Sequence, residues 1–509
     1  MALAKVLSGT TVGLESTPIN IEVSIEEVGF PAFTIVGMAD KAVEESRERV
    51  RSAIKSSGLE FPRHRVTVNL TPADLPKRGA SFDLPIAIGI LIASGALEIE
   101  VKDALFFGEL SLDGSLRHTP GAITLGTLCE KLNIPNLYLP ETNALEASFI
   151  SGIKPFGVLK LSDLVKHLAG DNNLIATPTH DFNELINAEI TYPLDFKEVR
   201  GQEQAKRALE IAAAGGHNVA MKGPPGSGKT MLARALPSIL PKLTPKEAFE
   251  VTKIYSVTGN LPAEESFMKT RPFRSPHHTT SRIGLVGGGS HPTPGEISLA
   301  HRGVLFLDEF PELDRATLEA LRQPLEDGFV SVSRAAGTMV FPSKFILIVA
   351  SNPCPCGNLG SSNRKCICNA HQIENYKKRI SGPILDRIDI HLEVPAVEID
   401  KLVGNNIVAA EDSTAVRSRV QAARDRQEKR LKDAGLTCNA EMSTRHIKEF
   451  CEISNDSQNL LKTAVANMGL SARGYFRILK VARTIADLAG SDTIETPMIA
   501  EALQYRTQT

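Results

Sequence analysis

The chain has 509 residues, of which 42% are hydrophobic and 23% are charged, and its formal net charge is −2. This length predicts about three domains. The near-neutral charge excludes a global basic footprint, so contacts with nucleic acid would need locally gathered basic residues. The longest apolar run begins at Leu84, is too short to span a bilayer and predicts a buried helix. Because the first residues lack the apolar segment of a signal peptide, we expect a cytoplasmic protein without membrane contact, in which Cys129, Cys438 and Cys451 are reduced thiols.

Residues 1–168 alternate strand-like and helix-like segments, which predicts a first α/β domain. Strands are expected at residues 31–37, 64–70 and 134–140. Residues 40–58 have the spacing of an amphipathic helix, which Asp40 caps at its N-terminus and Gly58 ends.

The rest of the chain divides into three stretches. Residues 169–192 lack periodicity and are expected to form a linker. Residues 193–396 again alternate strand-like and helix-like segments, and residues 397–509 carry a run of helical patterns. The predicted fold class is therefore multi-domain α/β with a helical C-terminal part.

A nucleotide site is the strongest functional signal. An apolar strand pattern leads into G-x-x-x-x-G-K-T and then into a helix pattern. Glycine permits the turn that points successive N–H groups at phosphate oxygens, lysine reaches the outer phosphates, and threonine offers a hydroxyl to Mg²⁺. The predicted nucleotide-binding residues are Gly223, Pro224, Pro225, Gly226, Ser227, Gly228, Lys229 and Thr230.

The apolar run at residues 304–307 ends in Asp308 and Glu309. An aspartate there can hold Mg²⁺, and the adjacent glutamate can polarise the attacking water. The alternative is an ordinary strand that ends in a solvated acid pair.

"GPPGSGKT", "LFLDE", "FILIVASN" and "SGPILDRID", in this order, resemble the motifs of an AAA+ ATPase, and the resemblance covers residues 193–509. It implies that Asn352 orients the hydrolytic water. It also implies that Arg387 is an arginine finger for a neighbouring subunit, that Arg473 is the sensor arginine of a helical lid, and that the protein forms a ring, expected to be a hexamer. The alternatives are a salt bridge of Arg387 with Asp386 or Asp389, and a solvated charge at Arg473.

Two inserts flank Asp308. Residues 271–302 contain four arginines, four histidines and one acid, with a Gly/Pro-rich stretch at 284–295 that predicts a flexible loop. Residues 328–344 alternate like a β-hairpin. Both are similar to pore inserts of the magnesium-chelatase-like and MCM-helicase-like AAA+ branch. We expect DNA phosphate contacts from Arg271, Arg274, Arg282 and Arg334. The alternative is that the arginines and histidines of the first insert cap structure near the nucleotide or clamp the next subunit.

"PADLPKRGASFDLPIAIGIL" and "FFGELSLDGSLRHTPGAITLG" resemble the proteolytic domain of Lon, a ribosomal S5 domain 2-like fold. Ser81 lies where that family has its nucleophile. Ile123 or a neighbour lies where the family has its lysine base, and without a base the serine is a poor nucleophile. We therefore expect an inactive domain in which Ser81 caps a helix. Lys77 precedes the glycine turn, which argues against a substitute base.

Four cysteines lie between the Asn352 and Arg387 motifs, in the spacing C-x-C-x9-C-x-C. Four thiolates from one short loop suffice for a tetrahedral, structural Zn²⁺, with His371 as a spare ligand and basic residues nearby. The alternative is a loop of reduced thiols, and a redox role has no C-x-x-C turn to support it. The expected ligands are Cys354, Cys356, Cys366 and Cys368.

Motifs such as "VNLTPADLPKRG", "AAAGGHN" and "RPFRSPHHT" extend the resemblance over the whole chain, which is identified as a member of the ComM/YifB family. The resemblance implies a hexameric motor that uses ATP and Mg²⁺ to migrate branched DNA in homologous recombination and natural transformation. One alternative is a chelatase-type ATPase that remodels a protein partner for metal insertion. The other is an ATP-dependent protease.

Overall fold

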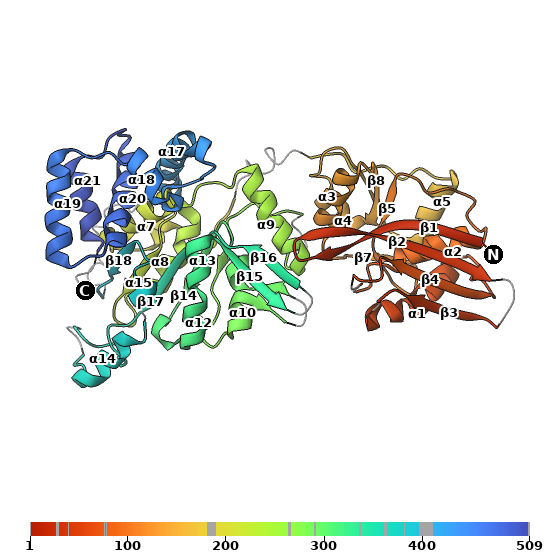
Figure 1. Ribbon diagram of the computed structural model, residues 1–509, viewed down its shortest axis with the longest axis horizontal. Helices are drawn as coiled ribbons and strands as arrows, with labels where there is room; N and C mark the ends of the chain where they lie inside the picture. Colours follow the sequence, from red (N-terminus) through yellow and green to blue (C-terminus); the bar gives the residue numbers. More distant parts are fainter. Residues whose placement is uncertain are drawn as a thin grey trace. The chain divides into compact units, whose positions relative to one another are not determined.

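The computed structural model describes residues 2–26, 30–38, 40–75, 77, 79–180, 190–262, 266–289, 292–334, 337–360, 364–380, 382–396 and 411–506. The chain forms two compact units. Unit 1 comprises Met1–Ala188 and Pro245–Met268, and unit 2 comprises Glu189–Thr244 and Lys269–Thr509 (Figure 1). Among the described residues, we find no helix with the length and apolar character of a membrane span.

The sheet of unit 1 has seven strands in the order β3-β4-β2-β1-β5-β8-β9. It starts with a long antiparallel hairpin of β1 (Ala2–Val12) and β2 (Glu15–Glu26). β2 pairs antiparallel with β4, and the other neighbouring strands run parallel. Strands β6 and β7 form a separate small hairpin. The further strands of unit 1 are β3 (Ala32–Val36), β4 (Arg65–Thr71), β5 (Ala104–Phe106), β6 (Glu109–Leu110), β7 (Leu116–Arg117), β8 (Asn136–Pro140) and β9 (Lys154–Val158).

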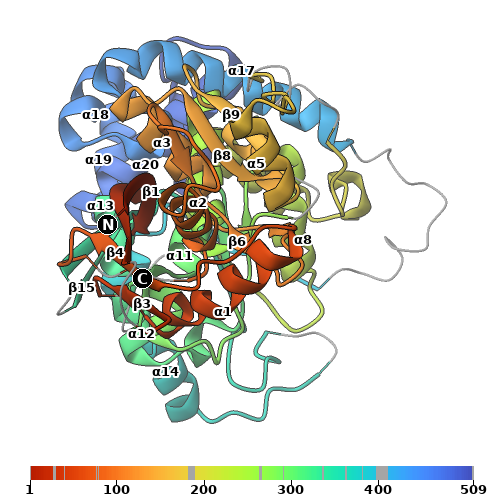
Figure 2. The same ribbon diagram turned by 90° about the vertical axis from the view of Figure 1, so that its right-hand side faces the viewer.

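Helices cover both faces of this sheet (Figure 2). Side chains alternate along a strand, so Tyr138 of β8 packs into one cluster and Leu137 and Leu139 pack into another. The first cluster includes α1 (Lys41–Ser56), α2 (Asp83–Ala93) and α5 (Leu161–Ala169). The second includes α3 (Ala122–Leu132), α4 (Glu141–Ala147) and Phe249 of α9 (Pro245–Thr258).

The predicted elements of unit 1 are observed. Asp40 caps α1 and accepts a hydrogen bond from the backbone N–H of Val43 at 2.9 Å. The run after Leu84 is the buried helix α2, whose Asp83 pairs with Arg49 at 2.6 Å between Nε and Oδ2. Of the predicted linker, residues 181–189 lie outside the described residues.

Unit 2 is built on five parallel strands in the order β11-β14-β17-β10-β18. The carboxyl ends of parallel strands meet at one edge of a sheet, where ligands of such folds bind. The strands are β10 (Val219–Lys222), β11 (Phe273–Arg274), β14 (Val304–Leu307), β17 (Ile346–Ser351) and β18 (Ile390–Glu393).

Short elements precede and connect these strands. The longest helix among them is α7 (Glu203–Gly215), before β10. The others are η1 (Phe196–Glu198), α8 (Lys229–Ala235), η2 (Leu236–Ile239), η3 (Phe310–Glu312), α12 (Arg315–Ala320), α13 (Arg322–Asp327), α14 (Ala370–Lys378) and α15 (Gly382–Leu385).

The second insert forms the predicted hairpin, β15 (Phe329–Arg334) and β16 (Gly337–Pro342). The first insert differs from its prediction at residues 284–295. Instead of a flexible loop it contains α10 (Arg282–Val286), an antiparallel pair of β12 (Gly287–Gly288) and β13 (Thr293–Pro294), and then α11 (Glu296–Leu299). A Cβ on Gly287 would come 2.4 Å from the carbonyl oxygen of Thr293, so glycine serves close backbone packing here.

The predicted helical part is observed after residue 411, and residues 397–410 lie outside the described residues. Its apolar side chains join those of the unit 2 sheet and α7 in one hydrophobic cluster. The elements are α17 (Ser413–Leu431), η4 (Lys432–Ala434), η5 (Asn439–Glu441), α18 (Thr444–Phe450), α19 (Asn455–Met468), α20 (Ala472–Ala489) and α21 (Thr496–Gln504).

Candidate nucleotide site

The glycine-rich loop runs from the end of β10 to the start of α8. Gly226 and Gly228 have φ of +77° and +90°, a region that residues with a Cβ rarely adopt. A Cβ on Gly223 would lie 2.1 Å from the carbonyl oxygen of Val394. The glycines of the motif are therefore required by backbone geometry.

Lys229 lies at the first position of α8, and its Nζ atom donates to the carbonyl oxygens of Gly223 at 2.8 Å and Pro224 at 2.9 Å. Burial lowers the pKa of Lys229, and the nearby carboxylate of Asp308 opposes this shift. The lysine is thus a partly desolvated cation held in the loop by carbonyl groups, with a side chain long enough to reach a phosphate.

Thr230 and Asp308 come from α8 and the end of β14. The threonine hydroxyl donates to Oδ2 of the aspartate at 2.9 Å. Hydroxyl and carboxylate oxygens are the ligands that Mg²⁺ prefers next to phosphates. The donor set therefore fits a magnesium ion.

Glu309 has a left-handed backbone, with φ 49° and ψ 40°. Its backbone N–H donates to Oδ1 of Asp308 at 2.9 Å, and its Oε2 lies 3.0 Å from Nδ1 of His278. His278 belongs to the first insert, so the insert contacts the carboxylate that could polarise water.

Asn352 directly follows β17, and its Oδ1 lies 3.4 Å from Nζ of Lys229. The structure therefore gathers Lys229, Thr230, Asp308, Glu309 and Asn352 at the carboxyl edge of the sheet.

Arg387 and Arg473 share one acidic partner, Glu326. Arg387 forms an ion pair with Glu326 of α13 and donates to the carbonyl oxygen of Pro383 at 2.7 Å. Arg473, at the start of α20, lies 3.8 Å from the same Glu326. The acid that holds Arg387 is thus Glu326 rather than Asp386 or Asp389.

Arg271 and Arg274 bond within unit 2. The guanidinium of Arg271 donates to three backbone carbonyl oxygens, among them that of Pro241 at 2.7 Å. Arg274 forms a two-pronged pair with Glu296, with distances of 2.6 and 2.7 Å. These contacts favour the structural alternative for both arginines.

Arg282 and Arg334 are placed differently. Arg282 is exposed at the first position of α10, beside the exposed Ile283. Arg334 is the last residue of β15, opposite Gly337 across the turn, and its side chain lies outside the described residues.

In unit 1, the expectation that Ser81 caps a helix is wrong. α2 begins at Asp83, its N-cap residue is Phe82, and no side chain caps it. The backbone carbonyl oxygen of Ser81 accepts a hydrogen bond from the N–H of Gly108 at 2.9 Å. The Nζ atom of Lys77 donates to the carbonyl oxygen of Pro72, and the Ile123 backbone N–H donates to Oε1 of Glu146 at 2.9 Å.

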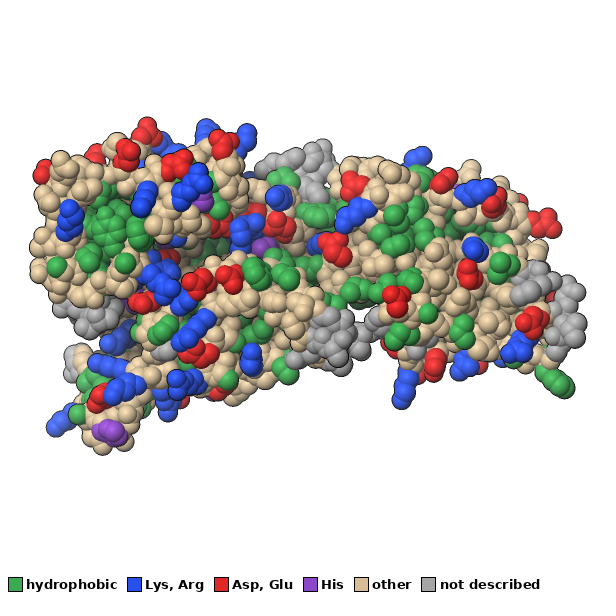
Figure 3. Space-filling view, viewed as in Figure 1, with side chains coloured by type: hydrophobic (Ala, Val, Ile, Leu, Met, Phe, Trp, Pro, Cys, Tyr) green, Lys and Arg blue, Asp and Glu red, His purple; other side chains and the backbone are tan. Residues whose placement is uncertain are grey.

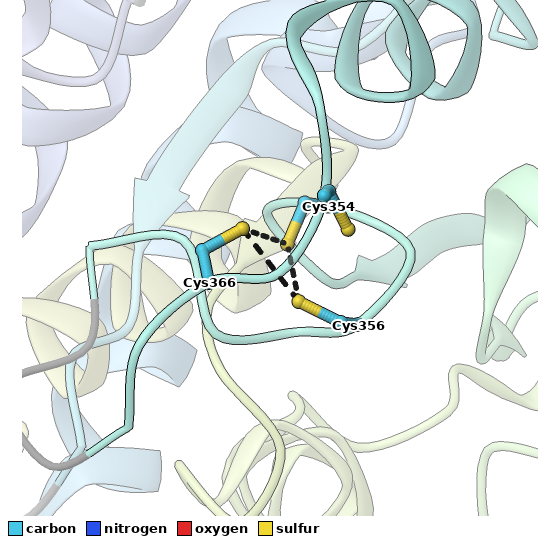
Figure 4. A group of neighbouring side chains, drawn as sticks. Cys354, Cys356 and Cys366 are labelled. Atoms are coloured by element: carbon cyan, nitrogen blue, oxygen red, sulfur yellow. Dashed lines mark hydrogen bonds between the residues drawn. The ribbon is translucent and has the colours of Figure 1, made fainter.

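Four cysteine sulfurs gather between β17 and α14 (Figure 4). All four lie within 4.8 Å of one another. The distance between Cys354 and Cys356 is 3.4 Å, and Cys366 lies 3.7 and 3.6 Å from them. Cys368 is the fourth member, so the structure brings together all four predicted ligands.

The sequence prediction missed Gln202 and Glu326, and it placed His278 near the nucleotide only as one of the histidines of the first insert. Gln202 has φ of +60°, and its Nε2 donates to the carbonyl oxygens of Pro395 at 2.7 Å and Ser227 at 3.4 Å. Gln202 and Glu326 are common polar residues outside a motif, and their contacts are with residues distant in sequence. For His278 alone a signal existed, the density of histidines in the first insert.

Comparison with known proteins adds independent evidence. The family "Subunit ChlI of Mg-chelatase" matches residues 21–143, "Magnesium chelatase, subunit ChlI" matches residues 195–402, and "Magnesium chelatase, subunit ChlI C-terminal" matches residues 410–506. Competence protein ComM of Haemophilus influenzae is 44% identical over 510 residues, which cover 99% of this chain and 98% of that protein. A protein named YifB from Salmonella typhimurium is 43% identical over 508 residues, with 99% and 97% covered. Lon protease 2 of Bacillus subtilis is 31% identical over 158 residues, with 29% and 28% covered.

Proposed function

The chain belongs to the ComM/YifB family of magnesium-chelatase-like AAA+ proteins, and from this premise we propose that it is an ATP-driven motor that moves branched DNA. Membership of this family implies ATPase activity. The name of the relative from Haemophilus influenzae, a competence protein, supports a task in natural transformation and recombination.

ATP binds to residues 223–230 in this proposal, with Lys229 on the outer phosphates and backbone N–H groups on the others. Thr230 and Asp308, whose oxygens lie 2.9 Å apart, would hold Mg²⁺. A bound magnesium ion would neutralise charge on the phosphates. Glu309 accepts a proton from the attacking water, and the Asn352 side chain orients that water.

Arg387 and Arg473 complete the site of the next subunit in a ring, which we propose to be a hexamer. Both guanidinium groups lie at the carboxylate of Glu326, so together they form one cationic edge. Fixed cations stabilise the charge that develops on the transferring phosphoryl group. By this account unit 1 is a Lon-like domain without protease chemistry, since buried Ala122 and Ile123 occupy the lysine position.

The observation that carries the motor proposal is the contact between His278 and Glu309, 3.0 Å between Nδ1 and Oε2. A residue of the first insert touches the carboxylate that activates water. Hydrolysis at the phosphates can therefore move the first insert. If that insert grips DNA, its movement pulls the bound DNA strand. In this proposal Arg282 of the first insert and Arg334 of the hairpin make this grip.

A branch-migration assay tests the proposal. Purified protein with ATP should convert a four-way DNA junction to its products, and DNA should raise its ATPase rate. Arg334→Ala should weaken DNA binding for all sequences and reduce the salt dependence of binding by about one phosphate contact. The matched control is Arg445→Ala, an exposed arginine of α18 that should leave both unchanged. The motor proposal would be contradicted if DNA left the ATPase rate unchanged and the protein converted none of the four-way junction.

The family description "Magnesium chelatase, subunit ChlI" favours a second candidate, an ATPase that remodels a protein partner for metal insertion. This reading expects no DNA effect of Arg334→Ala and the recovery of a chelatase partner in a pull-down. An ATP-dependent protease is the third candidate. It would require ATP-dependent casein turnover that Ser81→Ala abolishes.

A further inference from the structure

We propose that Cys354, Cys356, Cys366 and Cys368 bind one zinc ion, and that the metal fixes the loop that supports the nucleotide site. The four sulfur atoms lie within 4.8 Å of one another. They come from two C-x-C pairs, one of which directly follows β17 while the other precedes α14.

The spacing of the sulfurs matches one tetrahedral ion. A Zn–S bond of about 2.3 Å places the ligands of a tetrahedron about 3.8 Å apart. The three measured separations are 3.4, 3.6 and 3.7 Å. A tetrathiolate set selects zinc or iron, and these separations leave room for one ion rather than a multi-iron cluster.

Backbone amides support the sulfurs. The N–H groups of Asn358 and Ile367 hydrogen-bond to the sulfur of Cys356. The N–H of Cys368 bonds to the sulfur of Cys366, and that of Cys356 bonds to the sulfur of Cys368. Such N–H groups orient thiolate ligands and reduce the repulsion between their charges. Three of the four sulfurs thus accept hydrogen bonds from backbone N–H groups, as metal-bound thiolates do.

The cysteine loop touches the glycine-rich loop. A Cβ built on Gly357, one residue after Cys356, would lie 2.6 Å from Cδ of Pro225. Tyr376 of α14 is buried and hydrogen-bonds to the backbone of Asn352. A metal that joins both ends of the loop would therefore hold Pro225 and Asn352 in place. This second half of the inference depends on the proposed ATP site, whereas zinc binding does not.

Exposed basic side chains lie near the four cysteines in sequence. Arg364, Lys365 and Lys377 are exposed, and Figure 3 shows Lys and Arg side chains gathered over the part of the molecule that carries α14.

Metal analysis of the purified full-length protein tests zinc binding. We expect one zinc ion per chain, reduced at least about tenfold in Cys366→Ser and in Cys368→Ser, since loss of one thiolate weakens the site strongly. The control Cys129→Ser, a buried cysteine of unit 1, should keep its zinc. Wild-type protein with one iron per chain, or with no metal and four freely titrating thiols, would overturn the proposal. None of these results depends on ATPase activity.

Two glycines test the link to the nucleotide site. Gly357 and Gly360 have nearly equal φ of +78° and +76°, but a Cβ on Gly360 meets nothing within 4 Å. Alanine at either position therefore strains the backbone alike, and only Gly357→Ala presses on Pro225. We expect zinc to remain in both variants and the KM for ATP to rise about tenfold in Gly357→Ala alone, as small displacements of positioning groups do.

Chelation of zinc from the wild-type protein should raise the KM for ATP in the same way, and added zinc should restore it. Equal KM values for ATP in both glycine variants would overturn the link between the zinc loop and the nucleotide site, and so would a KM that zinc removal leaves unchanged. The measured metal content decides zinc binding separately.

Discussion

Glu309 occupies a backbone conformation that few non-glycine residues adopt. Such strain persists only where the surroundings hold it. Here the hydrogen bond from its N–H to the Asp308 carboxylate and the contact with His278 hold it. Because of this left-handed turn the two neighbouring carboxylates have different partners. Asp308 contacts Thr230, and Glu309 contacts His278 of the first insert.

Glu309→Gln should abolish hydrolysis and spare ATP binding, because an amide cannot accept the proton of the attacking water. We expect the ATPase rate to fall by about 10²–10⁴-fold, measured by phosphate release, with ATP affinity retained in a fluorescent-nucleotide titration. Glu312→Gln is the control, since that carboxylate pairs with Arg379 instead. A variant that hydrolyses ATP at the wild-type rate would remove Glu309 from the reaction.

Individual site residues were predictable where backbone geometry demands one residue type. Only glycine fits positions 226 and 228, so the motif itself fixes where Lys229 and Thr230 lie. Arg271 and Arg274 show the limit of this reasoning. Their positive charge was visible in the sequence, but their partners are backbone carbonyls and Glu296, which only the folded chain brings near.

At the scale of elements, Asp389 joins α20 to the start of β18. It is buried, forms an ion pair with Arg477, lies 3.4 Å from Nδ1 of His217 and accepts the backbone N–H of Asn218 at 3.2 Å. Burial opposes its ionisation, but Arg477 and His217 outweigh burial and hold its pKa far below the usual range. The ionised Asp389 carboxylate therefore contributes its full stabilisation at pH values above the pKa of an ordinary aspartate, and this stabilisation is lost only as the pH falls well below it.

Asp389→Asn should destabilise unit 2 by about 3–5 kcal/mol, because the partly buried Arg477 would lose its buried counter-charge. Urea denaturation at neutral pH measures this loss of unfolding free energy. Asp386→Asn, three residues earlier in the same segment, should change it by less than about 0.5 kcal/mol. Equal stability of the two variants would show that the ion pair contributes little.

Long periodic segments were the most predictable elements. The helices of residues 411–506 and the apolar strands β14 and β17 follow directly from their patterns. The opening hairpin β1–β2 was missed, because its register depends on cross-strand pairing over its whole length. Residues 284–295 have a loop-like composition, yet their glycines permit close approach of β12 and β13.

At the scale of the whole molecule, Arg387 and Arg473 share one acid, Glu326. Glu326 belongs to α13, whereas Lys229 begins α8 and Asp308 follows β14. The arrangement fits arginines that serve another copy of the chain, which is the basis of the proposed ring.

Mixing two inactive variants tests this division of labour. Lys229→Ala and Arg387→Ala should each lose ATPase activity, the second by about 10³–10⁵-fold in rate. A mixed ring contains interfaces that combine the intact loop of one variant with the intact arginine of the other, about a quarter of all interfaces by random assortment. We therefore expect activity to reappear in the mixture. Lys229→Ala mixed with Glu309→Gln is the control and should stay inactive, because both defects lie on the same side of the interface.

Helix α9 stands between the glycine-rich loop and the Asp308 strand in sequence, but its residues belong to unit 1. Its Ser256 hydroxyl hydrogen-bonds to the buried Glu146 of α4, and its Phe249 packs on the cluster of α3. The chain consequently passes from one unit to the other three times, after residues 188, 244 and 268. One proteolytic cut in the segment before residue 190 would leave the two units covalently joined. A shortened gene that begins after that segment would encode α9 without the surface on which it folds.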